Sequence, residues 1–257
     1  MGLGFNVVDQ GPRDAPVVML SHSLAANLDM WSAQALALAD EFRVLRYDTR
    51  GHGASEAPDG AYSFEQLTGD VIALLDALNI ERVHFVGLSL GGMTALGLAL
   101  DHASRIASIC AANCGAQTPD GGGAMWEERI AIARGQGMAV LVEPTLARWF
   151  TADMLATRQA EVAPVRAMIA HTPVAGYVGC CAALKTLAYR DRLDRLRLPA
   201  LFIAGAEDPA VPVAVMRDMH ARVVGSRYVE LAAAHLSNLE CAAAFNTALK
   251  DFLRAQL

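Results

Sequence analysis

The sequence predicts an α/β fold in which a mainly parallel sheet carries helices on both faces and a helical lid insertion. Short runs rich in Val, Ile, Leu and Phe alternate with longer segments of helical period, which is typical of βαβ units. The 257 residues, 54% of them hydrophobic, are enough to bury one large core. Residues 117–190 show helical periodicity without a convincing strand, which indicates the insertion.

Six apolar runs are expected to form the strands. Each is short and is followed by a turn or by a segment of helical period. Parallel strands of this kind place their chemistry in the loops at their C-terminal ends. The expected strands span residues 17–20, 43–47, 84–86, 106–111, 200–204 and 227–231.

Helices are expected between these strands. At 64–78 the apolar residues follow an i, i+3, i+4, i+7 stripe, so one face should pack on the sheet. A second helix is expected at 92–100. The flexible Thr-Pro-Asp-Gly-Gly-Gly stretch at 118–123 then opens the insertion. We therefore expect an α/β core of residues 1–116 and 191–257 and a helical cap of residues 117–190.

Charge and composition favour a small-molecule partner. The net charge of -6 gives no electrostatic reason to expect nucleic acid or an anionic membrane surface. The N-terminal stretch lacks the pattern of a secretory signal, so a cytoplasmic location is expected. Five cysteines fit neither a disulfide framework nor zinc-ligand spacing, so we expect no metal and reduced, buried thiols at positions 110, 114, 180, 181 and 241.

Residues 84–92, His-Phe-Val-Gly-Leu-Ser-Leu-Gly-Gly, carry the strongest functional signal. They contain a Gly-x-Ser-x-Gly motif between an expected strand and an apolar helical run. A sharp strand-to-helix turn strains the serine backbone, and side chains with a Cβ would collide at Gly87 and Gly91. Ser89 would then stand at a helix N-terminus, where N–H groups bind developing negative charge. The motif predicts Ser89 as a catalytic nucleophile.

A serine hydroxyl is a weak nucleophile and needs a base held by an acid. Asp208 follows one expected strand and His235 follows the last, which gives the chain order serine, acid, histidine of α/β-hydrolases. Glu207 is the alternative acid. We favour Asp208 because Pro209 holds the preceding residue in an extended turn.

Six other histidines compete for the role of base: residues 22, 52, 84, 102, 171 and 220. His84 lies within an expected strand, and His102 and His220 lie near helix ends, so packed or surface positions are expected. His52 belongs to a Gly-His-Gly turn and is expected to be structural. His22 is expected to fix its loop by hydrogen bonds.

An oxyanion hole in such a site needs two N–H donors aimed at the tetrahedral oxygen. The residue after the nucleophile, Leu90, supplies the first. The second is expected from the Leu-Ser-His-Ser-Leu loop at 20–24, which ends an expected strand, and Leu24 is the residue we assign to it. A plain turn without this role is the alternative.

These motifs are shared with a known group: the chain resembles the 3-oxoadipate enol-lactonases of the α/β-hydrolase superfamily over nearly its whole length. The match runs through Ser-His-Ser-Leu at 21–24, Met30-Trp31, residues 43–53, Gly-Leu-Ser-Leu-Gly-Gly-Met at 87–93, Trp126 with Arg129 and Ile130, Trp149-Phe150, Tyr177 with Gly-Cys-Cys-Ala at 179–182, residues 191–193, and His-Leu-Ser-Asn-Leu-Glu at 235–240.

The resemblance implies an α/β-hydrolase fold and hydrolysis of a small anionic enol-lactone to 3-oxoadipate in aromatic-compound degradation, the beta-ketoadipate pathway. It implies no metal and no organic cofactor. The chain departs from the family after Cys110, where a Cys-Asn-Thr-like run is replaced by Asn-Cys-Gly-Ala-Gln at 113–117. The lid entrance shapes the pocket, so this departure bears on the substrate.

An anionic lactone that loses its hydration needs a paired cation. Trp126, Arg129 and Arg134 fall near one helical face, Trp149 is expected to form an opposite apolar wall, and Lys185 is a further cation. We favour Arg134 and then Arg129 as the anchor. The alternative is that these arginines are solvated lid residues.

Three other functions remain open at this point. A carbon-carbon bond hydrolase for a dienoate would use the same three residues in a larger pocket, and a carboxylesterase would act on another small ester. A ligand receptor would keep the fold without turnover. A dehalogenase is not expected, because that chemistry uses a carboxylate nucleophile, whereas position 89 is serine.

Overall fold

The computed structural model describes residues 4–257 and contains a seven-stranded sheet of order β1-β3-β2-β4-β5-β6-β7. Only the first strand is antiparallel to its neighbour, so the mainly parallel sheet is confirmed. The strands are β1 (Val7–Gln10), β2 (Val17–Ser21), β3 (Arg43–Tyr47), β4 (Val83–Leu88), β5 (Ile106–Ala112), β6 (Ala200–Gly205) and β7 (Arg227–Leu231).

The six expected strands are all present, within two residues of their expected bounds. Strand β1 was not expected. Its sequence, Val-Val-Asp-Gln, is too short and polar to stand out, and all four residues are half-buried at the sheet edge. Pairing with β3, rather than an apolar pattern of its own, makes this segment a strand.

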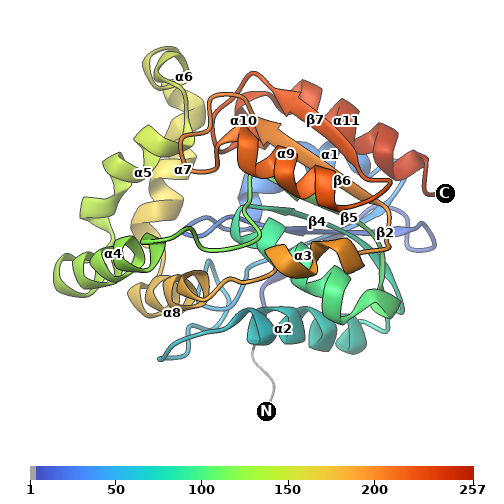
Figure 1. Ribbon diagram of the computed structural model, residues 1–257, viewed down its shortest axis with the longest axis horizontal. Helices are drawn as coiled ribbons and strands as arrows, with labels where there is room; N and C mark the ends of the chain where they lie inside the picture. The colour runs from blue at the N-terminus through green and yellow to red at the C-terminus, as the bar shows by residue number, and fades with distance from the viewer. Residues whose placement is uncertain (1–3) are drawn as a thin grey trace.

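Helices cover both faces of the sheet (Figure 1), with α1 against α11 on one face and α2 against α3 on the other. Helix α2 begins with a capping box in which Ser63 and Gln66 each accept the other's backbone N–H. Its buried face is the apolar stripe seen in the sequence. The helices of this part are α1 (Ser32–Leu38), α2 (Phe64–Ala77), α3 (Leu90–Asp101), α9 (Val213–Arg222), α10 (Ser237–Glu240) and α11 (Ala242–Arg254), with short 3₁₀ turns at Leu28–Trp31, Ala103–Arg105 and Arg190–Arg195.

Between β5 and β6 the chain forms helices that lie beyond the C-terminal edge of the sheet, at the left in Figure 1. Helix α4 packs against α8, and α5 against α7. At the base, Thr118 N–H donates to the carbonyl of Leu187 at 2.9 Å. These helices are α4 (Gly122–Gln136), α5 (Val142–Trp149), α6 (Ala152–Thr157), α7 (Gln159–His171) and α8 (Val174–Lys185), with a 3₁₀ turn at Ala139–Leu141.

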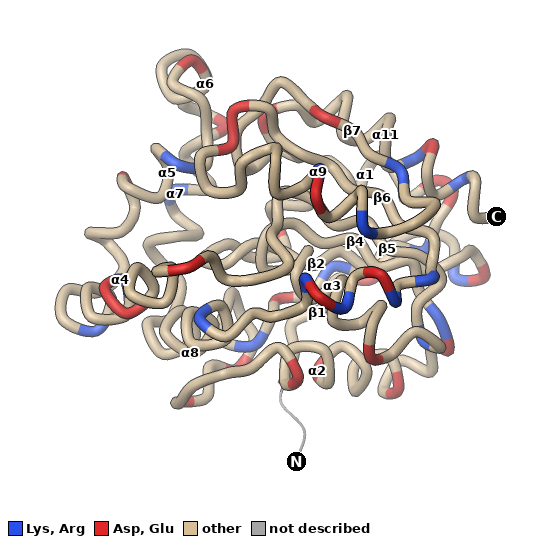
Figure 2. Tube along the Cα trace, in the orientation of Figure 1, with Lys and Arg blue, Asp and Glu red and all other residues tan. Residues whose placement is uncertain are grey.

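We propose that residues 117–190 form a cap on a core made of 1–116 and 191–257, of which residues 1–3 lie outside the described chain. One hydrophobic cluster runs from the sheet into these cap helices. Strands β2, β4, β5 and β6 contain no charged residue, whereas charged residues mark the helices and loops around them, including a group near α3 in Figure 2.

All five cysteines are free thiols. Four are buried, as expected, but Cys241 is only half-buried at the start of α11, so the expectation of a core position is wrong for that residue. Within residues 4–257 no single helix is long and apolar enough to cross a membrane, and α7 and α8 reach that length and composition only together, across a 92° bend.

Candidate active site

Ser89 stands in the turn between β4 and α3, at the C-terminal edge of the sheet. Its backbone angles, φ 55° and ψ -114°, are strained for a residue with a side chain. A Cβ on Gly87 would come within 2.0 Å of the Gly91 carbonyl oxygen, and a Cβ on Gly91 within 2.1 Å of the Ser21 carbonyl oxygen. Both positions therefore require glycine, and the turn that they permit brings Ser89 to a cavity.

His235, in the loop after β7, pairs with Asp208, in the loop after β6. His235 Nδ1 donates to Asp208 Oδ2 at 2.8 Å, which leaves Nε2 as the acceptor on the ring that lines the cavity. Asp208 Oδ1 accepts the backbone N–H groups of Ala210 and Val211. Glu207 is exposed to solvent. The structure thus brings the histidine together with Asp208 and not with Glu207.

The Asp208 side chain is fully buried, which by itself would raise the pKa of the carboxyl group. The attraction and hydrogen bond of His235, together with hydrogen bonds from Asn113 and the Val211 N–H, outweigh burial and hold the pKa of Asp208 below its ordinary value. Asp208 is therefore ionised at neutral pH and fixes the orientation of the imidazole.

Asn113, directly after β5, is a part of this network that sequence reasoning missed. Its Nδ2 donates to Asp208 Oδ2 at 3.0 Å and to the Ala234 carbonyl at 3.2 Å, and its Oδ1 accepts from Ser237 Oγ. Asn113 is fully buried with φ 44°. It ties the loop of the acid to the loop of the histidine. Two features of the sequence could have pointed to Asn113: it lies just after an expected strand, and it lies in the stretch at 113–117 where the chain departs from the family pattern.

His22 and His52 hold the loop that follows β2. His22 Nδ1 donates to the Ser23 carbonyl at 2.7 Å, and its Nε2 accepts the Thr49 N–H at 2.9 Å. His52 Nε2 accepts the N–H of Ala25, which has φ 59°. Burial lowers the pKa of both rings, that of His52 to about 3 with a further contribution from His22. Both histidines are neutral and act as clamps, in agreement with the structural roles expected for them.

The other four histidines lie away from the cavity. His84 sits in β4 and bonds to Ser108 Oγ at 2.8 Å. His102 lies at the end of α3, and His171 and His220 lie on helices α7 and α9. His235 is thus the histidine that lines the cavity within the described part of the chain.

Leu24 and Leu90 lie where backbone donors near Ser89 are expected. Leu24 lines the cavity in the loop held by His22 and His52. Leu90 follows Ser89 as the first residue of α3, and the first N–H groups of a helix have no partner within that helix. The N–H groups of Leu24 and Leu90 therefore remain the candidates for the two oxyanion donors.

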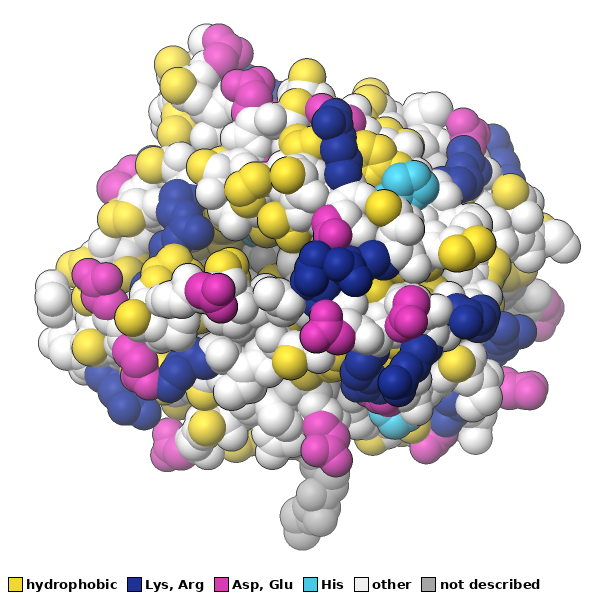
Figure 3. Space-filling view, viewed as in Figure 1, with side chains coloured by type: hydrophobic (Ala, Val, Ile, Leu, Met, Phe, Trp, Pro, Cys, Tyr) yellow, Lys and Arg dark blue, Asp and Glu magenta, His cyan; other side chains and the backbone are white. Residues whose placement is uncertain are grey.

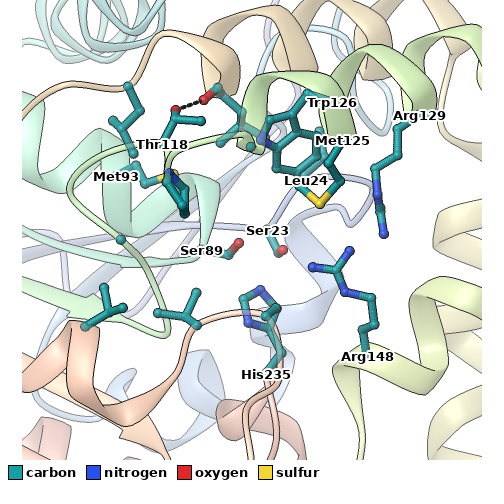
Figure 4. Close-up of a pocket in the computed structure, with 18 of the residues that line it drawn as sticks. Ser23, Leu24, Ser89, Met93, Thr118, Met125, Trp126, Arg129, Arg148 and His235 are labelled. Atoms are coloured by element: carbon teal, nitrogen blue, oxygen red, sulfur yellow. Dashed lines mark hydrogen bonds between the residues drawn. The ribbon is translucent and has the colours of Figure 1, made fainter.

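A cavity of about 390 Å³ opens over Ser89, between the core and the cap. It is seen as a hollow in the surface in Figure 3, and Figure 4 shows Ser89 and His235 at one side with Arg129 and Arg148 at another. Trp126 and Arg129 reach it from α4, and Arg148 and Trp149 from the end of α5. The Trp149 ring stacks on the His235 ring with centroids 6.4 Å apart.

Arg148 lines the cavity and was also missed by the sequence analysis, although it adjoins Trp149. Burial, and then the nearby charge of Arg129, lower the pKa of Arg148. Arg129 Nη1 donates to Tyr177 Oη at 3.4 Å, and its guanidinium lies over the Trp126 ring. Within residues 4–257 neither arginine forms a salt bridge with a carboxylate. Two cations therefore face one cavity without a salt-bridge partner among the described residues, and the Asp208 carboxylate acts on Arg148 only at longer range.

Arg134 and Lys185, also expected near the substrate, do not line the cavity. Arg134 lies five residues beyond Arg129, so the helix has turned by about 140° and exposes it to solvent. Lys185 forms a salt bridge with Glu127 instead. The prediction that Arg134 is the first candidate for the cavity was therefore wrong. Arg129 lies three residues after Trp126, and this spacing places both side chains on the same face of the helix.

Comparisons with known proteins identify the family of the chain. Residues 16–241 match the model of the alpha/beta hydrolase fold family. The 3-oxoadipate enol-lactonase 2 of Acinetobacter baylyi is 36% identical, over 98% of this chain and 94% of its own length. Two crystal structures each have a TM-score of 0.95: an enol-lactonase from Burkholderia xenovorans LB400, 42% identical with 98% and 97% of the two chains covered, and a hydrolase from Pseudomonas aeruginosa PA01, 40% identical with 98% and 95% covered.

The expected fold class and the resemblance are thereby confirmed. The match to the family model spans most of the chain, and the similar enol-lactonases align with it almost from end to end. The chain belongs to the α/β-hydrolase family and, within it, to the hydrolases that act on lactones and esters.

Proposed function

We propose that this protein hydrolyses 3-oxoadipate enol-lactone, a small lactone that carries a carboxylate, to 3-oxoadipate without a metal or organic cofactor. The observation that carries the proposal is the pair Arg129 and Arg148, which face the cavity of Ser89 and His235 without carboxylate partners among the described residues. The enol-lactonase names of similar proteins support the same substrate.

In the proposed reaction Ser89 Oγ attacks the lactone carbonyl carbon while its proton moves to His235 Nε2. Asp208 holds the imidazole in the required tautomer and stabilises the imidazolium. The N–H groups of Leu24 and Leu90 stabilise the tetrahedral oxyanion. When the C=O bond re-forms, the ring C–O bond breaks, and the released enol oxygen takes the proton from His235.

The acyl-enzyme is then hydrolysed by the same two steps, with water as the nucleophile and Ser89 as the leaving group. Water gives a proton to His235 and adds to the ester carbon, and Ser89 leaves with that proton. The released enol converts to the ketone, which gives the 3-oxo acid. Because the substrate is cyclic, the leaving oxygen stays on the same carbon chain as the acyl group.

The substrate carboxylate would lie between Arg129 and Arg148. Taking an anion out of water costs several kcal/mol unless a cation is paired with it. Burial and mutual repulsion already disfavour the charge on Arg148, so an anion placed between the two guanidiniums relieves an existing cost. Trp126 and Trp149 would pack against the apolar part of the ring.

Product analysis tests the proposal. The purified protein is incubated with the enol-lactone, a neutral lactone of similar size, a small ester and a ring-cleavage dienoate, and products are identified by mass. We expect the highest kcat/KM on the enol-lactone, with addition of one water to give the open dicarboxylic keto acid.

Ser89→Ala, with unchanged circular dichroism, serves as the control and should show no turnover on any substrate. If cleavage of a carbon-carbon bond in the dienoate is the fastest reaction, the protein is a carbon-carbon bond hydrolase and the lactonase assignment is wrong. Turnover by Ser89→Ala at the wild-type rate would overturn the proposed nucleophile.

A further inference from the structure

Ser23, between the clamped His22 and Leu24, has a backbone that is fixed on both sides. Its carbonyl accepts His22 Nδ1 at 2.7 Å and the Ala26 N–H at 3.1 Å, and its own N–H donates to Met30 Sδ at 3.3 Å. His22 is itself anchored to the Thr49 N–H. The position from which the Ser23 side chain projects is therefore determined before any substrate binds.

The Ser23 hydroxyl has no such partner. The residue is only 1% exposed, yet within the described chain Oγ makes no hydrogen bond. A buried hydroxyl without a partner has lost its hydrogen bonds to water and gained none, so such groups are rare unless a ligand completes them. Ser23 lines the cavity, and Figure 4 shows its hydroxyl beside Ser89, across from the His235 ring.

We propose that Ser23 is a further catalytic residue, whose Oγ–H donates a third hydrogen bond to the oxyanion formed when Ser89 adds to the carbonyl. This inference rests on the proposed function, because it needs Ser89 as the nucleophile. Ser23 adjoins Leu24, so its hydroxyl and the Leu24 N–H approach the carbonyl oxygen from the same loop. A donor that is fixed in place and not bonded to the protein needs little reorganisation during the reaction.

Ser23 neither gains nor loses a proton during the proposed reaction. As the bond from Ser89 Oγ to the carbonyl carbon forms, the carbonyl π electrons move to oxygen, and the Ser89 proton goes to His235 Nε2. Ser23 donates a hydrogen bond to that oxygen without transferring its proton. When the C=O bond re-forms and the C–O bond to the leaving group breaks, His235 returns its proton to the leaving oxygen.

The test uses Ser23→Ala in the full-length protein with 4-nitrophenyl acetate, a neutral ester whose hydrolysis does not depend on the identity of the lactone. Loss of one oxyanion donor lowers kcat by about 10²-fold in comparable sites. We expect kcat and kcat/KM to fall together by about that factor, with KM nearly unchanged, because the bond forms only in the transition state.

A second readout measures the oxyanion directly. A trifluoromethyl ketone adds to a serine hydroxyl and leaves a tetrahedral oxyanion, so its affinity should fall by a factor similar to that in kcat. Ser23→Cys, which keeps a donor at the same position on a slightly larger side chain but is a weaker donor, should lie between wild type and Ser23→Ala. Ser108→Ala is the matched control, because Ser108 is equally buried but bonds to His84 outside the cavity.

The outcomes separate this inference from the proposed function. If Ser23→Ala keeps wild-type kcat and inhibitor affinity while Ser89→Ala is inactive, the nucleophile stands and the role of Ser23 is overturned. A rise in KM alone would also overturn it, since that result describes ground-state binding. If Ser23→Ala does not fold, the kcat and inhibitor affinity of Ser23→Cys decide by the same criteria.

Discussion

The floor of the cavity and its cap wall hold their charged groups in opposite ways. On the floor, Asp208 accepts four hydrogen bonds, from His235, Asn113 and two backbone N–H groups. On the wall, Arg129 has one long hydrogen bond to Tyr177, and Arg148 is partly buried beside it with a lowered pKa.

This difference suggests that the floor carries out the reaction and that the wall selects the substrate. The hydrogen bonds of Asp208 to His235 and Asn113 are formed without a substrate, so in the proposed reaction the floor would act on any acyl group that reaches Ser89. The wall carries two cations that form no salt bridge with a described residue, so an anionic ligand could pair with them directly. We therefore expect changes on the floor to affect every substrate, and changes on the wall to affect mainly anionic ones.

The largest effect is expected on the floor. Asp208→Asn should lower kcat by about 10⁴-fold on anionic and neutral substrates alike, because the amide favours the wrong tautomer of the histidine, as in the serine-protease example. The measurement is steady-state kinetics on both substrate types. Glu207→Gln changes the exposed neighbour and should keep wild-type rates. If Glu207→Gln proves the more damaging of the two, the acid has been assigned to the wrong residue.

A smaller and selective effect is expected on the wall. Arg129→Met or Arg148→Met should weaken kcat/KM for the anionic lactone by about 1.5–3 kcal/mol, the value of a charge-assisted hydrogen bond. A neutral ester of similar size should be nearly unaffected. Arg134→Met, on the solvent side of α4, is the control. Equal losses on the two substrates would mean that the arginines shape the wall without binding a carboxylate.

A further effect, on stability and not on catalysis, concerns the clamps under the loop at 22–25. Burial lowers the pKa of His22 and, to about 3, that of His52, whereas an unfolded histidine titrates near 6.5. Below pH 6.5 the unfolded chain therefore binds protons that the folded chain does not, and the stability of the fold falls as the pH drops from about 6.5 toward 3. Each clamp contributes at most about 1.4 kcal/mol per pH unit.

Urea unfolding at about pH 7 and pH 5 measures this slope. His52→Gln should flatten it, because the amide can accept the Ala25 N–H without titrating, and His171→Gln at an exposed position should leave it unchanged. A slope that is the same in all three proteins would contradict the assignment of His52 as a buried neutral clamp.

Much of the fold follows from local patterns that the sequence shows directly. The buried parallel strands are apolar runs, and α2 shows both its capping box and its apolar stripe. Strand β1 could not be found in this way, because its four half-buried residues have no distinctive pattern and become a strand only by pairing with β3.

The sequence by itself determined the turn at Ser89 and the order of Ser89, Asp208 and His235. Glycine at 87 and 91 is a local steric requirement, and the ends of parallel strands necessarily meet at one edge of the sheet. The tertiary structure alone decided the partners of these residues. Asn113, Ser23 and Arg148 come from three distant segments, and which side of each loop or helix faces the cavity depends on packing between those segments, which no periodicity within one segment records.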